Sequence, residues 1–181
     1  MERYRIVFSG SGGQGVITSA VVLAEAAVLY DNLMAVQTQA YGAAARGGST
    51  RSDVIISDSD IDFPKVNQPN ILICLTQEAY NGFYHIIRPG GILITDTRYV
   101  VTERKVDAIQ YELPLYKTVM EKIGRPIVLN ICMLGALIGL ADLVNPESII
   151  KVLETRIPAA FLDMNRLALS LGMELAQPYR K

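Results

Sequence analysis

The sequence predicts one three-layer α/β/α domain over residues 1–181, with a mostly parallel, Rossmann-like sheet and a helical C-terminal portion. Strand-like and helix-like segments alternate through the first hundred residues, and this alternation is typical of right-handed crossovers between parallel strands. Residues 71–75 form a continuous apolar run, which is the pattern of a parallel strand covered on both faces. A length of 181 residues also suits one domain, because domains average roughly 150 residues.

Each element of the first half follows from a change in residue pattern. Short apolar runs that stop at glycine or at polar turn residues predict strands. Residues 16–30 form helix readily and are apolar on almost every side, which predicts a helix covered by more than one layer. Residues 58–70 are polar and contain two prolines, which predicts a long loop. The expected order is strand 5–9, helix 16–30, strands 34–39, 50–57 and 71–75, helix 77–87 and strand 92–95.

The second half is mostly helical. Residues 106–113 have weaker strand character, with apolar residues at alternate positions. The apolar run over residues 127–144 predicts a buried helix. Gly135 and Gly139 lie four positions apart on it and would let another helix approach closely, within this domain or from a partner subunit. The expected helices are 115–123, 127–144, 146–155 and 159–176.

The composition excludes several classes of protein. Half of the residues (50%) are hydrophobic and 19% are charged, which excludes a disordered chain, and a net charge of −1 lacks the basic footprint of a nucleic-acid-binding protein. The mean hydropathy of +0.26 is high, so the chain enters a membrane, has a sheet covered on both faces, or hides apolar surface against a partner. The longest uncharged run, residues 126–141, is shorter than the about 20 residues of a membrane-spanning helix. The N-terminus also lacks a secretory-signal pattern, so we expect a cytoplasmic protein without membrane contact.

No self-contained catalytic or metal centre is evident in the sequence. Cys74 and Cys132 lie in apolar segments without a second cysteine or histidine at ligand spacing, so both are expected to be buried free thiols. The chain is therefore not expected to hold an iron–sulfur cluster or a structural zinc by itself. His85 is the only histidine and is expected to be a surface or packing residue. No catalytic residue and no metal ligand is assigned to this chain.

A glycine-rich loop follows the first predicted strand and opens the first predicted helix. Glycines let the backbone turn sharply, and the helix N-terminus favours an anion there. The dinucleotide-binding pattern also needs an acidic residue at the end of the second strand, but none occurs between Asp31 and Asp53. The alternative is a tight strand-to-helix turn without a ligand. The candidate site residues of this loop are Gly10, Gly12, Gly13, Gln14 and Gly15.

A second candidate loop follows the second predicted strand. It is expected at the same edge of the sheet as the first loop, because open parallel sheets bind ligands at the carboxyl ends of their strands. The guanidinium of Arg46 suits a carboxylate or a phosphate, and the glycines after it allow close approach of the backbone. A solvated basic turn is the alternative. The candidate residues are Arg46, Gly47, Gly48 and Ser49.

Taken together, these motifs resemble the gamma subunit of 2-oxoacid:ferredoxin oxidoreductases over essentially the whole chain. The motifs are Gly10-Ser11-Gly12-Gly13-Gln14-Gly15-Val16, Tyr41-Gly42, Arg46-Gly47-Gly48-Ser49, Pro69-Asn70-Ile71-Leu72 and Gly90-Gly91-Ile92-Leu93. The resemblance implies a multi-subunit enzyme in which thiamine diphosphate attacks a 2-oxo acid and CO2 leaves. Electrons then pass through iron–sulfur clusters to ferredoxin, and coenzyme A takes the acyl group.

The resemblance also assigns roles to the partner subunits. Thiamine diphosphate, magnesium and the clusters are implied to belong to them, so this chain binds no cofactor alone and is not expected to be active alone. Its two glycine loops are implied to face the active site or the approach of coenzyme A.

The substrate and the function class stay open at this point. Residues 43–45 are all alanine, where many 2-oxoglutarate-type members carry Pro-Glu. The keto acid is therefore undecided among 2-oxoglutarate, pyruvate, branched-chain and indolepyruvate types. Two alternative functions remain, a stand-alone Rossmann-type nucleotide-binding dehydrogenase and a scaffold without a ligand at the glycine loops.

Overall fold

The computed structural model describes residues 3–40, 49–103 and 106–180, with a six-stranded sheet in the middle of the domain. The strands are β1 (Tyr4–Gly10), β2 (Met34–Ala40), β3 (Thr50–Ser57), β4 (Ile71–Cys74), β5 (Gly91–Asp96) and β6 (Ala108–Leu113). The α-helices are α1 (Val16–Tyr30), α2 (Gln77–Phe83), α3 (Leu115–Lys122), α4 (Leu129–Ala141), α5 (Pro146–Arg156) and α6 (Ala159–Ala176). Short 3-10 helices are η3 (Tyr84–Ile86), η4 (Pro126–Val128) and η5 (Gln177–Tyr179). The predicted α/β fold with a helical C-terminal portion is confirmed.

The sheet has the order β2-β3-β1-β4-β5-β6 and is mixed rather than wholly parallel. β1, β4, β5 and β6 pair in parallel, whereas β3 pairs antiparallel with both β1 and β2. The segment between Ala40 and Thr50 is shorter than the dozen or more residues that a parallel crossover needs, so β3 has to run back along β2. β2 consequently runs in the direction of β1, and the carboxyl ends of both strands lie at one edge.

Most predicted elements are confirmed within two residues of their ends, and α1 and α6 have the predicted ends. Two long predicted helices are divided. Residues 77–87 contain α2 and then η3, and residues 127–144 contain part of η4 and then α4. Pro126 occupies the first turn of η4, and α4 ends at Asp142, whose φ of 48° is left-handed.

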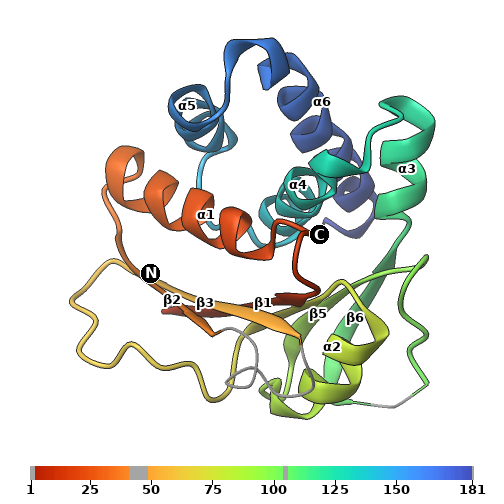
Figure 1. The fold of residues 1–181 in the computed structure, drawn as a ribbon. Helices are drawn as coiled ribbons and strands as arrows, with labels where there is room; N and C mark the ends of the chain where they lie inside the picture. Colours follow the sequence, from red (N-terminus) through yellow and green to blue (C-terminus); the bar gives the residue numbers. More distant parts are fainter. Residues whose placement is uncertain (1–2, 41–48, 104–105, 181) are drawn as a thin grey trace.

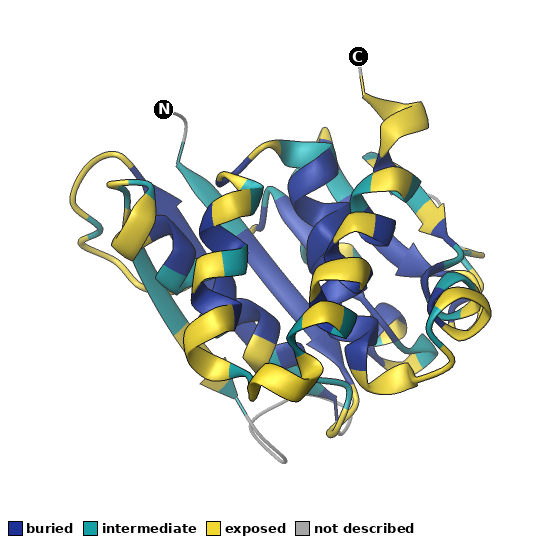
Figure 2. Ribbon diagram, turned by 90° about the horizontal axis from the view of Figure 1, so that it is seen from above, coloured by how far each residue is buried: buried dark blue, intermediate teal, exposed yellow. Residues whose placement is uncertain are grey.

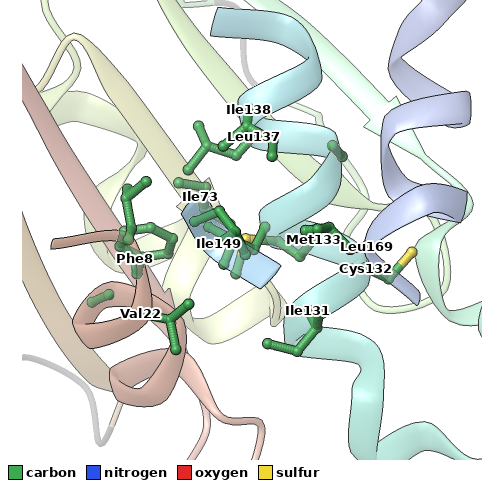
Figure 3. Packing of buried hydrophobic residues seen from close by; sticks show 14 of the residues in the cluster. Phe8, Val22, Ile73, Ile131, Cys132, Met133, Leu137, Ile138, Ile149 and Leu169 are labelled. Carbon is green, nitrogen blue, oxygen red and sulfur yellow. The ribbon is translucent and has the colours of Figure 1, made fainter. Parts of the chain in front are cut away.

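Helices cover the two faces of the sheet unequally. α1, α3, α4, α5 and α6 lie on one face and α2 on the other, so the predicted three layers are present (Figure 1). The helices turn buried residues toward the sheet and exposed residues outward (Figure 2). The larger cluster joins Phe8 and Ile73 of the sheet to Met133 and Leu137 of α4 (Figure 3). The smaller cluster lies under α2 and includes Tyr80.

The buried helix α4 packs against α6 with the two backbones in close contact. A Cβ atom at Gly172 would overlap the carbonyl oxygen of Cys132 and lie 2.7 Å from the amide nitrogen of Ala136. A Cβ atom at Gly135 would likewise overlap the carbonyl oxygen of Leu169. The close helix contact that the glycines of α4 predict is therefore made within this domain.

Coverage on both faces accounts for much of the high mean hydropathy. None of the helices in the part of the chain that the structure describes is both long and apolar enough to cross a membrane. α1 packs against both the sheet and the helices α4 and α5, so the prediction of more than one covering layer is confirmed, although in its last turn Val28 is 48% and Leu29 63% exposed. The sheet ends at β2, so no further strand or helix covers this turn.

Candidate glycine-loop site

The first glycine loop, residues 10–15, connects β1 to α1. Gly13 (φ 86°) and Gly15 (φ 72°) have left-handed backbones that residues with a side chain adopt only at a cost. A Cβ atom at Gly10 would lie 2.6 Å from Oε1 of Gln14, whereas one at Gly12 would meet nothing within 4 Å. A tight turn therefore accounts for three of these glycines and leaves Gly12, which is exposed, without a structural requirement.

Gln14 holds the loop together from inside. Its Oε1 accepts a hydrogen bond from the Ser11 amide at 2.8 Å, and its Nε2 donates to the Leu75 carbonyl at 3.3 Å. The side chain thus joins the loop to the residue after β4. This supporting role explains a polar side chain within a run of glycines.

Asn130 of α4 supports the loop from the helical layer, a role that sequence reasoning missed. It is only 7% exposed, and its Nδ2 lies 3.4 Å from the carbonyl oxygen of Gly15, to which it donates. Ser19 of α1 donates to the backbone oxygens of Gly15 and Asn130 at 3.2 and 3.1 Å. The available signal was a single amide in a long apolar run.

An open pocket of about 460 Å³ lies beside the loop, between the start of α1 and the helices η4, α4 and α6. Among the described residues that line it there is one cation, Arg125, and no carboxylate. Ile127, one of the lining residues, is 77% exposed. The pocket therefore suits an apolar side chain or the apolar part of a ligand. Its lining residues are Gly13, Gly15, Thr18, Arg125, Ile127, Val128, Asn130, Ile131, Ile157, Phe161, Met164 and Asn165.

Only part of the second candidate loop can be placed. Arg46, Gly47 and Gly48 lie outside the described residues. Ser49 is 1% exposed, and its hydroxyl has no hydrogen-bond partner among the described residues. Gly10, the last residue of β1, pairs with Thr50, the first residue of β3. Ala40, the last residue of β2, pairs with Arg51 next to it. The expectation that both loops begin from one edge of the sheet is therefore confirmed.

The two cysteines are buried free thiols, as predicted. Burial raises the pKa of both Cys74 and Cys132 to about 12, so neither is a thiolate at neutral pH. His85 is exposed and lies beside α2 rather than in the glycine-loop pocket. Within residues 3–40, 49–103 and 106–180, no three histidine, cysteine or acidic side chains come together as metal ligands.

Asp96 is a buried carboxylate that the sequence did not single out. It lies at the end of β5 with 0% exposure, and it accepts hydrogen bonds from the amides of Arg98 at 2.7 Å and Tyr116 at 2.6 Å. Desolvation raises its pKa above the ordinary aspartate value, and the two backbone hydrogen bonds oppose that rise. Asp96 thereby anchors the start of α3 to the sheet.

Comparison with known proteins identifies consistent relatives. Residues 5–175 match the family model described as pyruvate ferredoxin/flavodoxin oxidoreductase. The chain is 46% identical over 177 residues to the 2-oxoglutarate synthase subunit KorC of Methanocaldococcus jannaschii, a match that covers 97% of this chain and 95% of that protein.

Two solved structures share the fold. The gamma subunit of a keto/oxoacid ferredoxin oxidoreductase from Geobacter sulfurreducens superposes with a TM-score of 0.90 at 39% identity and covers both chains completely. The 2-oxoglutarate:ferredoxin oxidoreductase of Magnetococcus marinus, solved with 2-oxoglutarate, coenzyme A and succinyl-CoA bound, gives a TM-score of 0.89 at 22% identity. There the match covers this whole chain and 32% of the larger one.

Proposed function

This chain belongs to the pyruvate ferredoxin/flavodoxin oxidoreductase family and is the gamma subunit of a multi-subunit 2-oxoacid:ferredoxin oxidoreductase, and we propose that its complex oxidises 2-oxoglutarate. The observation that supports this substrate is the gradation of similarity. Relatives named as 2-oxoglutarate synthase subunits are 35–46% identical, whereas those named for ketoisovalerate or pyruvate are 27–30% identical. The alternative of a stand-alone dehydrogenase is not supported.

In this proposal the other subunits bind thiamine diphosphate, magnesium and the iron–sulfur clusters, and ferredoxin takes the electrons. The chain's own residues favour this division, because its two cysteines are buried and are too few for a four-cysteine cluster. The gamma subunit would then act through its surface. The exposed tip of the first glycine loop, the pocket beside it and the Arg46 loop form the surface that faces the active site or coenzyme A.

Purification of the native complex through a tag on this chain tests the function. We expect co-purified subunits that contain thiamine diphosphate and iron–sulfur clusters, and coenzyme A-dependent reduction of ferredoxin. Among 2-oxoglutarate, pyruvate, 2-oxoisovalerate and indolepyruvate, kcat/KM should be highest with 2-oxoglutarate. Preference for another keto acid would overturn the substrate. Recovery of only the free chain, with keto-acid oxidation unchanged after gene deletion, would overturn the function.

Gly12→Leu tests whether the loop faces another component of the complex. The isolated variant should keep its unfolding midpoint, because a side chain at Gly12 meets open space and the backbone there is not left-handed. Turnover of the complex should fall at least tenfold, since a bulky side chain would block the contact. Ser170→Leu, on an exposed position of α6, is the matched control and should leave turnover unchanged. Full turnover in the Gly12 variant would favour a scaffold without a ligand at this loop.

Arg46→Ala tests the second loop by its charge. If the guanidinium binds a carboxylate or phosphate of a substrate, the assembled complex should show a raised KM for the 2-oxo acid or for coenzyme A. Arg46→Lys retains the charge but loses the planar fork, so it should restore only part of the affinity. Wild-type KM values for both substrates in Arg46→Ala would remove this residue from the site.

A further inference from the structure

A second cavity, of about 770 Å³, lies at the opposite edge of the sheet from the glycine loop. Arg5, near the start of β1, lines it, whereas the glycine loop follows the end of the same strand. Loop 58–70 and the turn before β5 provide the remaining walls. The lining residues are Arg5, Phe63, Lys65, Asn67, Gln68, Arg88 and Pro89.

The charge of this cavity has one sign. Arg5, Lys65 and Arg88 contribute three cations from three separate segments, and none of the described residues that line the cavity is acidic. This concentration occurs in a chain whose net charge is −1. Like charges that share a concave surface raise the local potential and attract a compact anion.

The side chains of Arg5 and Lys65 form no ion pair within the described part of the chain, whereas several other cationic side chains do. Arg156 pairs with Glu25, and Arg166 pairs with Glu154. Asp58, Asp60 and Asp62 are in the same loop as Lys65 but do not line the cavity. The charges of Arg5 and Lys65 are therefore available to a ligand.

The remaining lining residues suit the organic part of such an anion. Phe63 is 59% exposed at the cavity and offers an aromatic face, and the amides of Asn67 and Gln68 can donate and accept hydrogen bonds. A smaller cavity of about 330 Å³ shares Lys65 and Asn67 and continues along α2. There Arg51 is bound by Asp53 at 2.7 Å, so the additional space carries little further net charge.

We propose that this cavity is a binding site for the diphosphate group of a nucleotide. Cations from three segments suit a compact polyanion, and the cavity volume lies in the range of about 300–1,000 Å³ typical of small-molecule sites. The site is separate from the glycine loops and does not depend on the function proposed for them.

Calorimetric titration of the full chain with ADP and with inorganic pyrophosphate tests the site. Both ligands should bind, ADP more tightly than pyrophosphate. The affinity for each should decrease as the NaCl concentration increases. Lys65→Gln and Arg5→Gln should each raise the Kd for ADP by about tenfold, the usual value of one hydrogen bond to a charged group. Lys117→Gln, which removes the same charge from an exposed position of α3, should leave the Kd unchanged.

Several results would overturn the proposal. No binding of either probe at millimolar concentration would exclude a diphosphate site, and ADP binding no tighter than pyrophosphate would exclude the nucleotide. Equal losses in Lys65→Gln and Lys117→Gln would mean non-specific attraction. Binding of a polyglutamate peptide without binding of pyrophosphate would identify an acidic protein partner instead. Loss of ADP binding in Gly12→Leu, with normal binding in Lys65→Gln, would place the nucleotide at the glycine loop.

Discussion

Gly172→Ala is expected to lower the free energy of unfolding by about 3 kcal/mol or more, at the upper end of the cost of overpacking. The added methyl would overlap the carbonyl oxygen of Cys132 and approach the amide of Ala136 at 2.7 Å. Both are backbone atoms of the buried helix α4, so no flexible side chain can move aside. α4 and α6 would have to separate, and the contacts on both sides of α4 would loosen.

The sign of the stability change distinguishes the helix contact from intrinsic helix propensity. In an exposed helix, Gly→Ala stabilises by about 1 kcal/mol, so any net destabilisation reports the helix contact. Urea unfolding of the isolated chain, followed by circular dichroism, measures it. Gly12→Ala is the matched control, because a methyl there meets nothing within 4 Å, and its midpoint should stay close to wild type. A Gly172→Ala chain as stable as wild type would contradict the α4–α6 packing.

Gly135→Ala provides a second probe of the same contact. Its methyl would overlap the carbonyl oxygen of Leu169, on the opposite helix. Because either substitution separates the two helices, the double variant should lose less stability than the two single losses added together. Strict additivity would show that the two glycines occupy independent contacts.

Asp96→Ala is expected to lower the free energy of unfolding by about 3 kcal/mol. The substitution leaves the amides of Arg98 and Tyr116 without acceptors, and an unpaired buried amide costs about 1–3 kcal/mol. The second of these amides belongs to the first turn of α3, so this end of the helix should also fray. Asp107→Ala, at an exposed position before β6, is the control and should change stability little.

The pH dependence of this variant gives an independent check. Burial raises the pKa of Asp96 in the folded chain, so the folded state binds a proton more tightly than the unfolded state. The contribution of this group to stability is therefore largest below pH of about 4 and declines as the pH rises through the folded-state pKa. The difference in unfolding free energy between wild type and Asp96→Ala should thus be larger at pH 4 than at pH 8. A difference that grows with pH would contradict the desolvated carboxylate.

Gly172→Ala and Gly135→Ala also bear on the proposed site, because α4 connects the helical layer to the glycine loop. Asn130, two residues before Cys132, donates to the carbonyl oxygen of Gly15. A shift of α4 away from α6 should therefore move the support of the loop as well. The buried α4–α6 contact thus helps to fix the geometry of the loop that we propose faces the complex.

Local patterns in the sequence determined the fold class and the place of the first loop. The ends of α1 follow from a helix-forming run bounded by a glycine loop and Asp31, and these signals act within a few residues. The carboxyl-edge position of both loops follows from the strand and helix order. The likeness of the motifs to the gamma subunit of the oxidoreductase also came from the sequence, because each of these motifs is an unbroken stretch of neighbouring residues.

Other features depend on contacts between distant segments, and only the tertiary structure decided them. The reversal of β3 depends on the reach of a short connection, which the strand pattern of residues 50–57 does not express. In the sequence, Gly172 is one small residue in a predicted helix. Its importance depends on the close contact with α4, which only the tertiary structure shows. Asp96 and Asn130 are single polar residues whose partners are 20 and 115 positions away. Arg5, Lys65 and Arg88 form one cavity because the sheet brings their segments to one edge. A local sequence pattern records neighbours along the chain, whereas burial, hydrogen bonds and electrostatic potential depend on neighbours in space.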